Sequence, residues 1–229
     1  MPVRKTPLVT DQIYHIFNRG LSGAPIFSGI KSYRRFMSCL MYYRFQKPPL
    51  KLSHFLVQSR EDQYDILYKL SANDDKLVEI FCFCLMPNHF HLLIKQVADK
   101  GISNFMRVIT NSYSSYFNLT KKRLGPLLQG IFKSVRIETD EQLLHVSRYI
   151  HINPLTGHIV LREKLTSFPW SSLPEYLRKE SLSEEETSKY INKSIVLSHF
   201  TSVKGYKRFI LDYADYKISQ ANFQHLFLE

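Results

Sequence analysis

The chain has 229 residues, of which 44% are hydrophobic and 14% aromatic, so it can bury a sizeable core and is neither disordered nor held together by disulfides. Its 31 Lys and Arg residues against 20 Asp and Glu residues give a net charge of +11, which favours a polyanionic partner. Nucleic acid is the first candidate and an anionic membrane surface the alternative, but no stretch approaches the roughly 18 apolar residues of a spanning helix. Three cysteines and no signal-peptide core predict a reduced, cytoplasmic protein.

The N-terminal part predicts a strand followed by a helix. Residues 12–19 alternate as a strand does, and two glycines then turn the chain. Apolar residues recur at helical spacing over 31–45, and a Pro-Pro pair ends that helix. Residues 46–76 are mixed and polar, with a turn at 73–75, so we predict an insertion there.

The middle of the chain predicts a β-hairpin and a long helix. Residues 78–86 are rich in Ile, Phe and Val, Pro87-Asn88 interrupts them, and residues 89–95 resume an extended pattern. From Ile102 to Phe117 apolar residues recur at steps of three and four, which indicates one buried helix face.

A further strand and helix follow. Residues 132–137 predict a short strand, Thr139 caps a helix, and Pro154 disfavours helix at Asn153 or just beyond. The element order predicts an α+β fold in which an antiparallel or mixed sheet has helices packed on one face.

The composition changes after Trp170-Ser171-Ser172, so we predict one domain over residues 1–177, with the insertion at about 46–76. The acidic run 184–186 and a helical apolar pattern over 206–213 predict a small helical C-terminal extension over 178–229.

The first group that carries chemistry is His89-Phe90-His91. It follows a tight turn and lies in an extended segment, so alternation places both imidazoles on one face of the strand. Two such rings can hold a divalent metal ion. The alternative is two ordinary histidines at the start of a strand.

The second group lies on the last predicted helix. Tyr149 and Asn153 are four residues apart and share one helical face. An amide oxygen there could complete a metal site while the phenol stands beside it as nucleophile. The alternative is a packed tyrosine and a helix-terminal asparagine. Tyr113 and Tyr116 are rival nucleophiles, but both lie on an apolar stripe that predicts core positions.

Several segments resemble the HUH-type single-tyrosine transposases, and specifically the branch of REP-associated tyrosine transposases. They occur in the expected order between residue 12 and about residue 177, and their joint occurrence is far more specific than any one of them. The segments are YHIFNRG at 14–20, LMPNHFHLLI at 85–94, YSSYFN at 113–118, YIHINP at 149–154 and WSS at 170–172.

Together with the element order, this resemblance implies a ferredoxin-like or RRM-like antiparallel sheet. It also implies that His89, His91 and Asn153 hold Mg²⁺ or Mn²⁺ and that Tyr149 is the nucleophile. The implied activity is cleavage and transfer of single-stranded DNA through a covalent 5′-phosphotyrosine. Relatives bind DNA hairpins, so single-stranded or hairpin DNA is the expected partner, and a homodimer is one alternative for the assembled state.

Six basic residues are expected to follow a DNA backbone, and a solvated basic face is the alternative for each. One departure from the family pattern is Ile131, where relatives usually have Arg, which affects a DNA contact but not the chemistry. The six residues are Arg19, Lys121, Lys122, Arg123, Lys133 and Arg136.

The rival functions are a non-catalytic nucleic-acid-binding protein and a metal-dependent nuclease that uses water.

Overall fold

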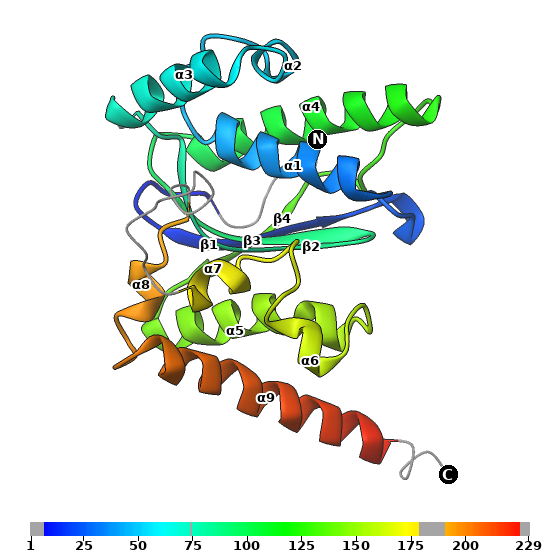
Figure 1. Ribbon diagram of the computed structural model, residues 1–229, viewed down its shortest axis with the longest axis vertical. Helices are drawn as coiled ribbons and strands as arrows, with labels where there is room; N and C mark the ends of the chain where they lie inside the picture. The colour runs from blue at the N-terminus through cyan, green and yellow to red at the C-terminus, as the bar shows by residue number, and fades with distance from the viewer. Residues whose placement is uncertain (1–6, 74, 179–190, 225–229) are drawn as a thin grey trace. The chain divides into compact units, whose positions relative to one another are not determined.

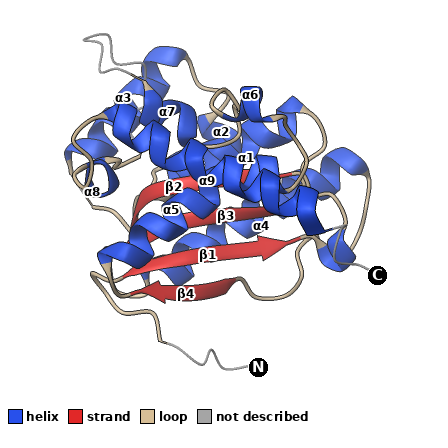
Figure 2. Ribbon diagram, turned by 90° about the horizontal axis from the view of Figure 1, so that it is seen from below, coloured by secondary structure: helices blue, strands red, loops and turns tan. Residues whose placement is uncertain are grey.

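A four-stranded sheet with strand order β2-β3-β1-β4 organises the computed structural model, which describes residues 7–73, 75–178 and 191–224 (Figure 2). Neighbouring strands are antiparallel: Gly20 N donates to Asn88 O at one end of the β1–β3 pair, and Asp11 N donates to Gln96 O at the other. The sheet and its helices confirm the predicted α+β fold. The strands are β1 (Ile13–Arg19), β2 (Val78–Met86), β3 (His89–Gln96) and β4 (Lys133–Ile137).

The chain divides into two compact units. The first comprises residues 1–79, 87–89 and 94–136, and the second comprises residues 80–86, 90–93 and 137–229. Both units draw on the β2–β3 hairpin, whose strands are buried along nearly all of their length.

In the first unit, α1 (Ile30–Tyr43) packs against α4 (Gly101–Lys121), and Figure 1 shows the two helices side by side. The apolar stripe predicted for α4 supplies this contact, because the rings of Phe36 and Tyr113 meet edge to face with centroids 5.1 Å apart. The Tyr113 hydroxyl also donates to the Ile26 carbonyl. Tyr113 is therefore a core residue, as its place on the stripe predicted.

The segment predicted as an insertion contains two helices of the first unit, α2 (Leu52–Phe55) and α3 (Arg60–Ala72). Ser59 caps α3, because its hydroxyl accepts a hydrogen bond from Asp62 N at 3.1 Å. Polar residues on α3 hid its helical period, and none of its side chains is buried.

In the second unit, α9 packs along α5 (Figure 1). It also contacts α7. The C-terminal helix thus belongs to the same compact unit as the predicted nucleophile helix, and this unit extends across the predicted boundary at residue 177. The acidic run 184–186 lies outside the described residues. The helices of this unit are α5 (Asp140–Thr156), α6 (Arg162–Leu165), α7 (Leu173–Leu177), α8 (Ser194–Leu197) and α9 (Val203–Gln224).

A buried hydrogen-bond network joins α5 to its neighbours in the second unit. His151 is fully buried, with Nδ1 2.7 Å from Tyr206 Oη on α9 and Nε2 2.7 Å from Ser172 Oγ. Since Ser172 Oγ donates its own proton to Phe83 O, the imidazole donates from Nε2 and accepts the Tyr206 proton at Nδ1. Desolvation lowers the His151 pKa to about 3, which keeps the ring neutral.

The structure extends α5 further than the sequence predicted. Pro154 lies inside the helix, which ends at Thr156 and not near Asn153. A proline in the last turn removes only one helical hydrogen bond. Gly157 N donates to Asn153 O at 2.8 Å and Ile159 N donates to Pro154 O at 2.8 Å, so these carbonyls keep partners beyond the proline.

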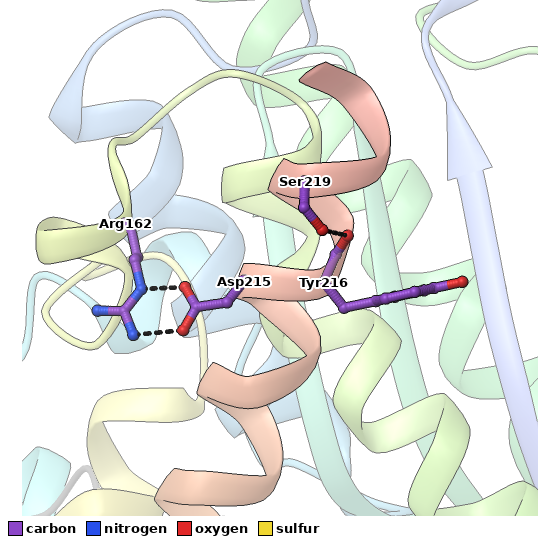
Figure 3. Close-up of polar contacts among 4 residues, drawn as sticks. All are labelled: Arg162, Asp215, Tyr216 and Ser219. Carbon is purple, nitrogen blue, oxygen red and sulfur yellow. Dashed lines mark hydrogen bonds and ion pairs between the residues drawn. The ribbon is translucent and has the colours of Figure 1, made fainter. Parts of the chain in front are cut away.

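A surface ion pair adds a contact between α6 and α9. The Arg162 guanidinium faces the Asp215 carboxylate and donates to both of its oxygens (Figure 3). None of the described helices combines the length and the apolar character that a bilayer span requires.

Candidate tyrosine and metal site

Tyr149 and Asn153 lie one turn apart on α5, as their spacing predicted. Tyr149 is 45% exposed, whereas Asn153 is 6% exposed. The Asn153 Nδ2 atom donates to the Tyr149 carbonyl at 3.0 Å. Because the amide nitrogen faces the helix backbone, Oδ1 is the atom of this side chain that can act as a ligand.

His91 lies against the candidate nucleophile within the second unit. It comes from β3, is 6% exposed, and its ring meets the Tyr149 ring edge to face with centroids 5.4 Å apart. Strand and helix therefore bring together two of the residues that the sequence predicted to act together, although 57 residues separate them in the chain. A half-exposed phenol beside a buried imidazole is an arrangement in which incoming DNA can reach the phenol.

His89 lies two residues earlier on the same strand and belongs to the first unit, where Asn88 orients its ring. The His89 Nδ1 atom is 2.7 Å from Asn88 Oδ1, and Asn88 Nδ2 donates to Gly23 O at 3.3 Å. Since Asn88 presents its oxygen to the ring, the proton lies on Nδ1 and the lone pair on Nε2. Histidine ligands of metals are commonly oriented by such a partner.

These donors suit a hard or borderline divalent ion. Imidazole nitrogens and an amide oxygen suit Mn²⁺ or Mg²⁺, whereas a closed structural zinc site uses thiolates. Burial raises the pKa of the Cys82 and Cys39 thiols to about 12, which disfavours the thiolate forms that such a zinc site needs. Within the described residues no three His, Cys, Asp or Glu side chains cluster as metal ligands. The predicted set contains two histidines and one asparagine, so it has only two residues of these four types and would not form such a cluster.

The two rival tyrosines have different environments. Tyr113 is fully buried, and burial raises the pKa of its hydroxyl. Tyr116 is partly exposed and lies under the Arg35 guanidinium, 5.3 Å from the ring centroid. His15 is buried, and desolvation lowers its pKa to about 4, which fits a structural role.

The six predicted DNA-binding residues all lie in the first unit. Arg19 ends β1 and its Nε donates to Gln129 Oε1, whereas Arg123 donates to Asn118 Oδ1 and to Pro126 O just beyond α4. Lys133 and Arg136 are exposed on β4, but two residues separate them, so the strand points them to opposite faces. Lys121 is the last residue of α4, and Lys122 caps it in the left-handed region with φ 50°.

The sequence analysis did not identify two residues that orient other parts of the site. Asn88 was interpreted only as a turn residue, although an amide directly before a histidine can orient the histidine ring. His151 lies in the YIHINP motif, and no role was predicted for it. Its position between Tyr149 and Asn153, on another face of α5, was the available signal for a contact that fixes the helix.

Comparison with known proteins agrees with the sequence motifs. The family described as "Transposase IS200 like" matches residues 53–153, a range that includes both motif histidines, Tyr149 and Asn153. A search of curated proteins gave no match. The fold is similar to a solved structure described as "Structure of the REP associates tyrosine transposase bound to a REP hairpin", with a TM-score of 0.54 and 13% sequence identity, covering 82% of this chain and 96% of that one. Over residues 53–153 the chain is similar to the IS200-like transposases, and its predicted resemblance to the REP-associated tyrosine transposases is confirmed.

Proposed function

We propose that this chain is a metal-dependent, single-strand DNA endonuclease and strand transferase that acts through a covalent 5′-phosphotyrosine. The observation that carries the proposal is the contact of the exposed Tyr149 ring with the buried His91 ring, one helical turn from Asn153. The net charge of +11 fits a DNA substrate. The structurally similar transposase is bound to a REP hairpin, which supports single-stranded or hairpin DNA as the partner.

The reaction follows from the groups that these residues supply. The Tyr149 hydroxyl loses its proton as its oxygen attacks the phosphorus of a phosphodiester in line with the leaving group. The P–O3′ bond breaks, and the released 3′ oxygen takes up one proton, which balances the proton lost by the phenol. The phosphotyrosine conserves the bond energy, so another 3′-hydroxyl can reverse the step on a second strand without ATP. Mg²⁺ or Mn²⁺ held by His89, His91 and Asn153 would supply charge neutralisation of the phosphate oxygens.

The environment of Asn153 and His89 supports their assignment as ligands. Each side chain has one polar atom hydrogen-bonded to a protein partner, which fixes the orientation of the side chain. Such orientation reduces the conformational entropy lost when a ligand binds.

The experiment is an adduct assay with a pool of random-sequence single-stranded oligonucleotides and Mn²⁺. A 5′-phosphotyrosine retains the 3′ fragment, so a fluorophore at the 3′ end should stay with the denatured protein, and the same fluorophore at the 5′ end should not. Sequencing the retained DNA identifies the preferred site. Tyr149→Phe removes only the phenolic oxygen and should abolish the adduct.

Tyr116→Phe is the matched control, because it removes a hydroxyl from the partly exposed rival, and it should leave the adduct intact. His89→Ala should lose Mn²⁺ affinity in isothermal titration and the adduct together. Retention of the adduct by Tyr149→Phe would move the nucleophile to another tyrosine. Cleavage of DNA with no adduct at any time would instead favour a nuclease that uses water, and absence of both would favour a DNA-binding protein without catalysis.

A further inference from the structure

Three hollows follow one another along α4 in the first unit. The first, of about 400 Å³, lies beside residues 125–132; the second, of about 600 Å³, faces α1 and α2; and the third, of about 470 Å³, lies where α1 begins and α4 ends. Arg107 and Asn111 line both the first and the second hollow, and Tyr116 lines both the second and the third. The shared residues lie between hollows that open on different sides of α4, so the three hollows are separate. We call the second hollow, which α4 forms with α1 and α2, the α4 track.

The α4 track is lined by positive charge. The track has three cationic side chains and no Asp or Glu among its described lining residues. None of the three was among the basic residues expected from the sequence to contact DNA. A concave surface with cations and no acidic side chain attracts a polyanion. The three are Arg35, Lys51 and Arg107.

Two tyrosine rings line the middle hollow. Tyr116 is partly exposed, and the Arg35 guanidinium lies 5.3 Å from its centroid, which limits the motion of both side chains. Tyr43 is held by its hydroxyl, which accepts a hydrogen bond from Leu52 N at 3.0 Å. Aromatic rings beside a basic groove are the combination that proteins use to stack unpaired bases while binding the phosphates.

We propose that the α4 track binds an unpaired DNA strand, with phosphates contacting Arg107 and Lys51 and bases resting against Tyr43 and Tyr116. The inference rests on the proposed function, since it gives the substrate strand a place of attachment.

The test is fluorescence anisotropy of labelled dT12, a strand that forms no hairpin, with the full chain in EDTA so that no DNA is cleaved. Arg107→Gln and Lys51→Gln should each weaken dT12 binding about three- to tenfold, and each should lower the slope of log K against log salt by about 0.7. Arg208→Gln is the matched control, because it removes the same charge from an exposed position on α9, and it should change affinity less than twofold. Tyr116→Leu should weaken binding at least fivefold at unchanged charge.

Equal effects of Arg107→Gln, Lys51→Gln and Arg208→Gln would show that net charge alone governs binding, and would overturn the α4 track. Polyglutamate that displaces dT12 at equal concentration would also overturn it, because the surface would then be a general anion site. Because Tyr116→Leu removes a ring from the surface, its thermal melting is compared with that of the wild type. The adduct assay separates this proposal from the proposed function. If Arg107→Gln forms the adduct normally and binds dT12 with unchanged affinity, the α4 track is rejected and the proposed function is not. Wild-type protein that binds no DNA rejects both.

Discussion

Replacing Tyr206 by Phe tests whether α9 holds the nucleophile helix in place. The substitution keeps the ring and removes the hydroxyl that donates to His151 Nδ1 at 2.7 Å. Both side chains are fully buried, so water cannot replace the lost donor without reorganising the core. An unsatisfied buried acceptor costs roughly 1–3 kcal/mol, and we expect the free energy of unfolding of the second unit to fall by about that amount.

The assay is urea unfolding followed by the fluorescence of Trp170, the only tryptophan in the sequence, which lies in the second unit. The midpoint should fall while the slope against urea stays unchanged, because the surface exposed on unfolding is the same. Tyr216→Phe is the control, since it removes a hydroxyl from an exposed tyrosine on the same helix (Figure 3), and it should change stability by less than about 0.5 kcal/mol. If the two variants unfold at the same midpoint, the buried network does not stabilise this unit, and the argument fails.

Three further substitutions test the local energetics. Gly101→Ala should lower the melting temperature, because the added Cβ would lie 2.1 Å from the Leu77 carbonyl oxygen, a backbone atom that cannot rotate away; an unchanged melting temperature would contradict the packing. Arg162→Ala should lower the urea midpoint only slightly, and high salt should remove the difference from wild type, because the ion pair with Asp215 is exposed to solvent; a large effect that persists in high salt would be inconsistent with a screened pair. Burial lowers the His15 pKa to about 4 in the folded chain. Between that pH and the ordinary imidazole pKa, the His15 ring therefore binds a proton in the unfolded chain but not in the folded one. Stability should therefore fall as the pH drops through that window, by up to about 1.4 kcal/mol per pH unit, and denaturation of His15→Gln across the same range should show a shallower fall.

Local periodicity was enough to predict most of the regular elements. Alternation predicted β1, and residues rich in Ile, Phe and Val around a Pro-Asn turn predicted the hairpin. The three-and-four spacing of apolar residues predicted α4, because such patterns arise within a few turns or pleats of one segment. The prediction missed the helices between residues 46 and 76, where no buried face imposes a period on α3. It also ended α5 too early, because the hydrogen bonds that follow Pro154 depend on how the next residues fold back.

The sequence by itself determined the candidate chemistry: two histidines with strand spacing, a tyrosine and an asparagine with helix spacing, and a positive charge suited to DNA. Only the tertiary structure decided that His91 meets Tyr149, that Asn88 orients His89, and that α9 fixes α5 through Tyr206 and His151. It also decided that three basic side chains and two tyrosines line one hollow beside α4. The physical reason is that spacing fixes the direction of a side chain within its own strand or helix, whereas contacts between distant segments depend on how buried surfaces pack.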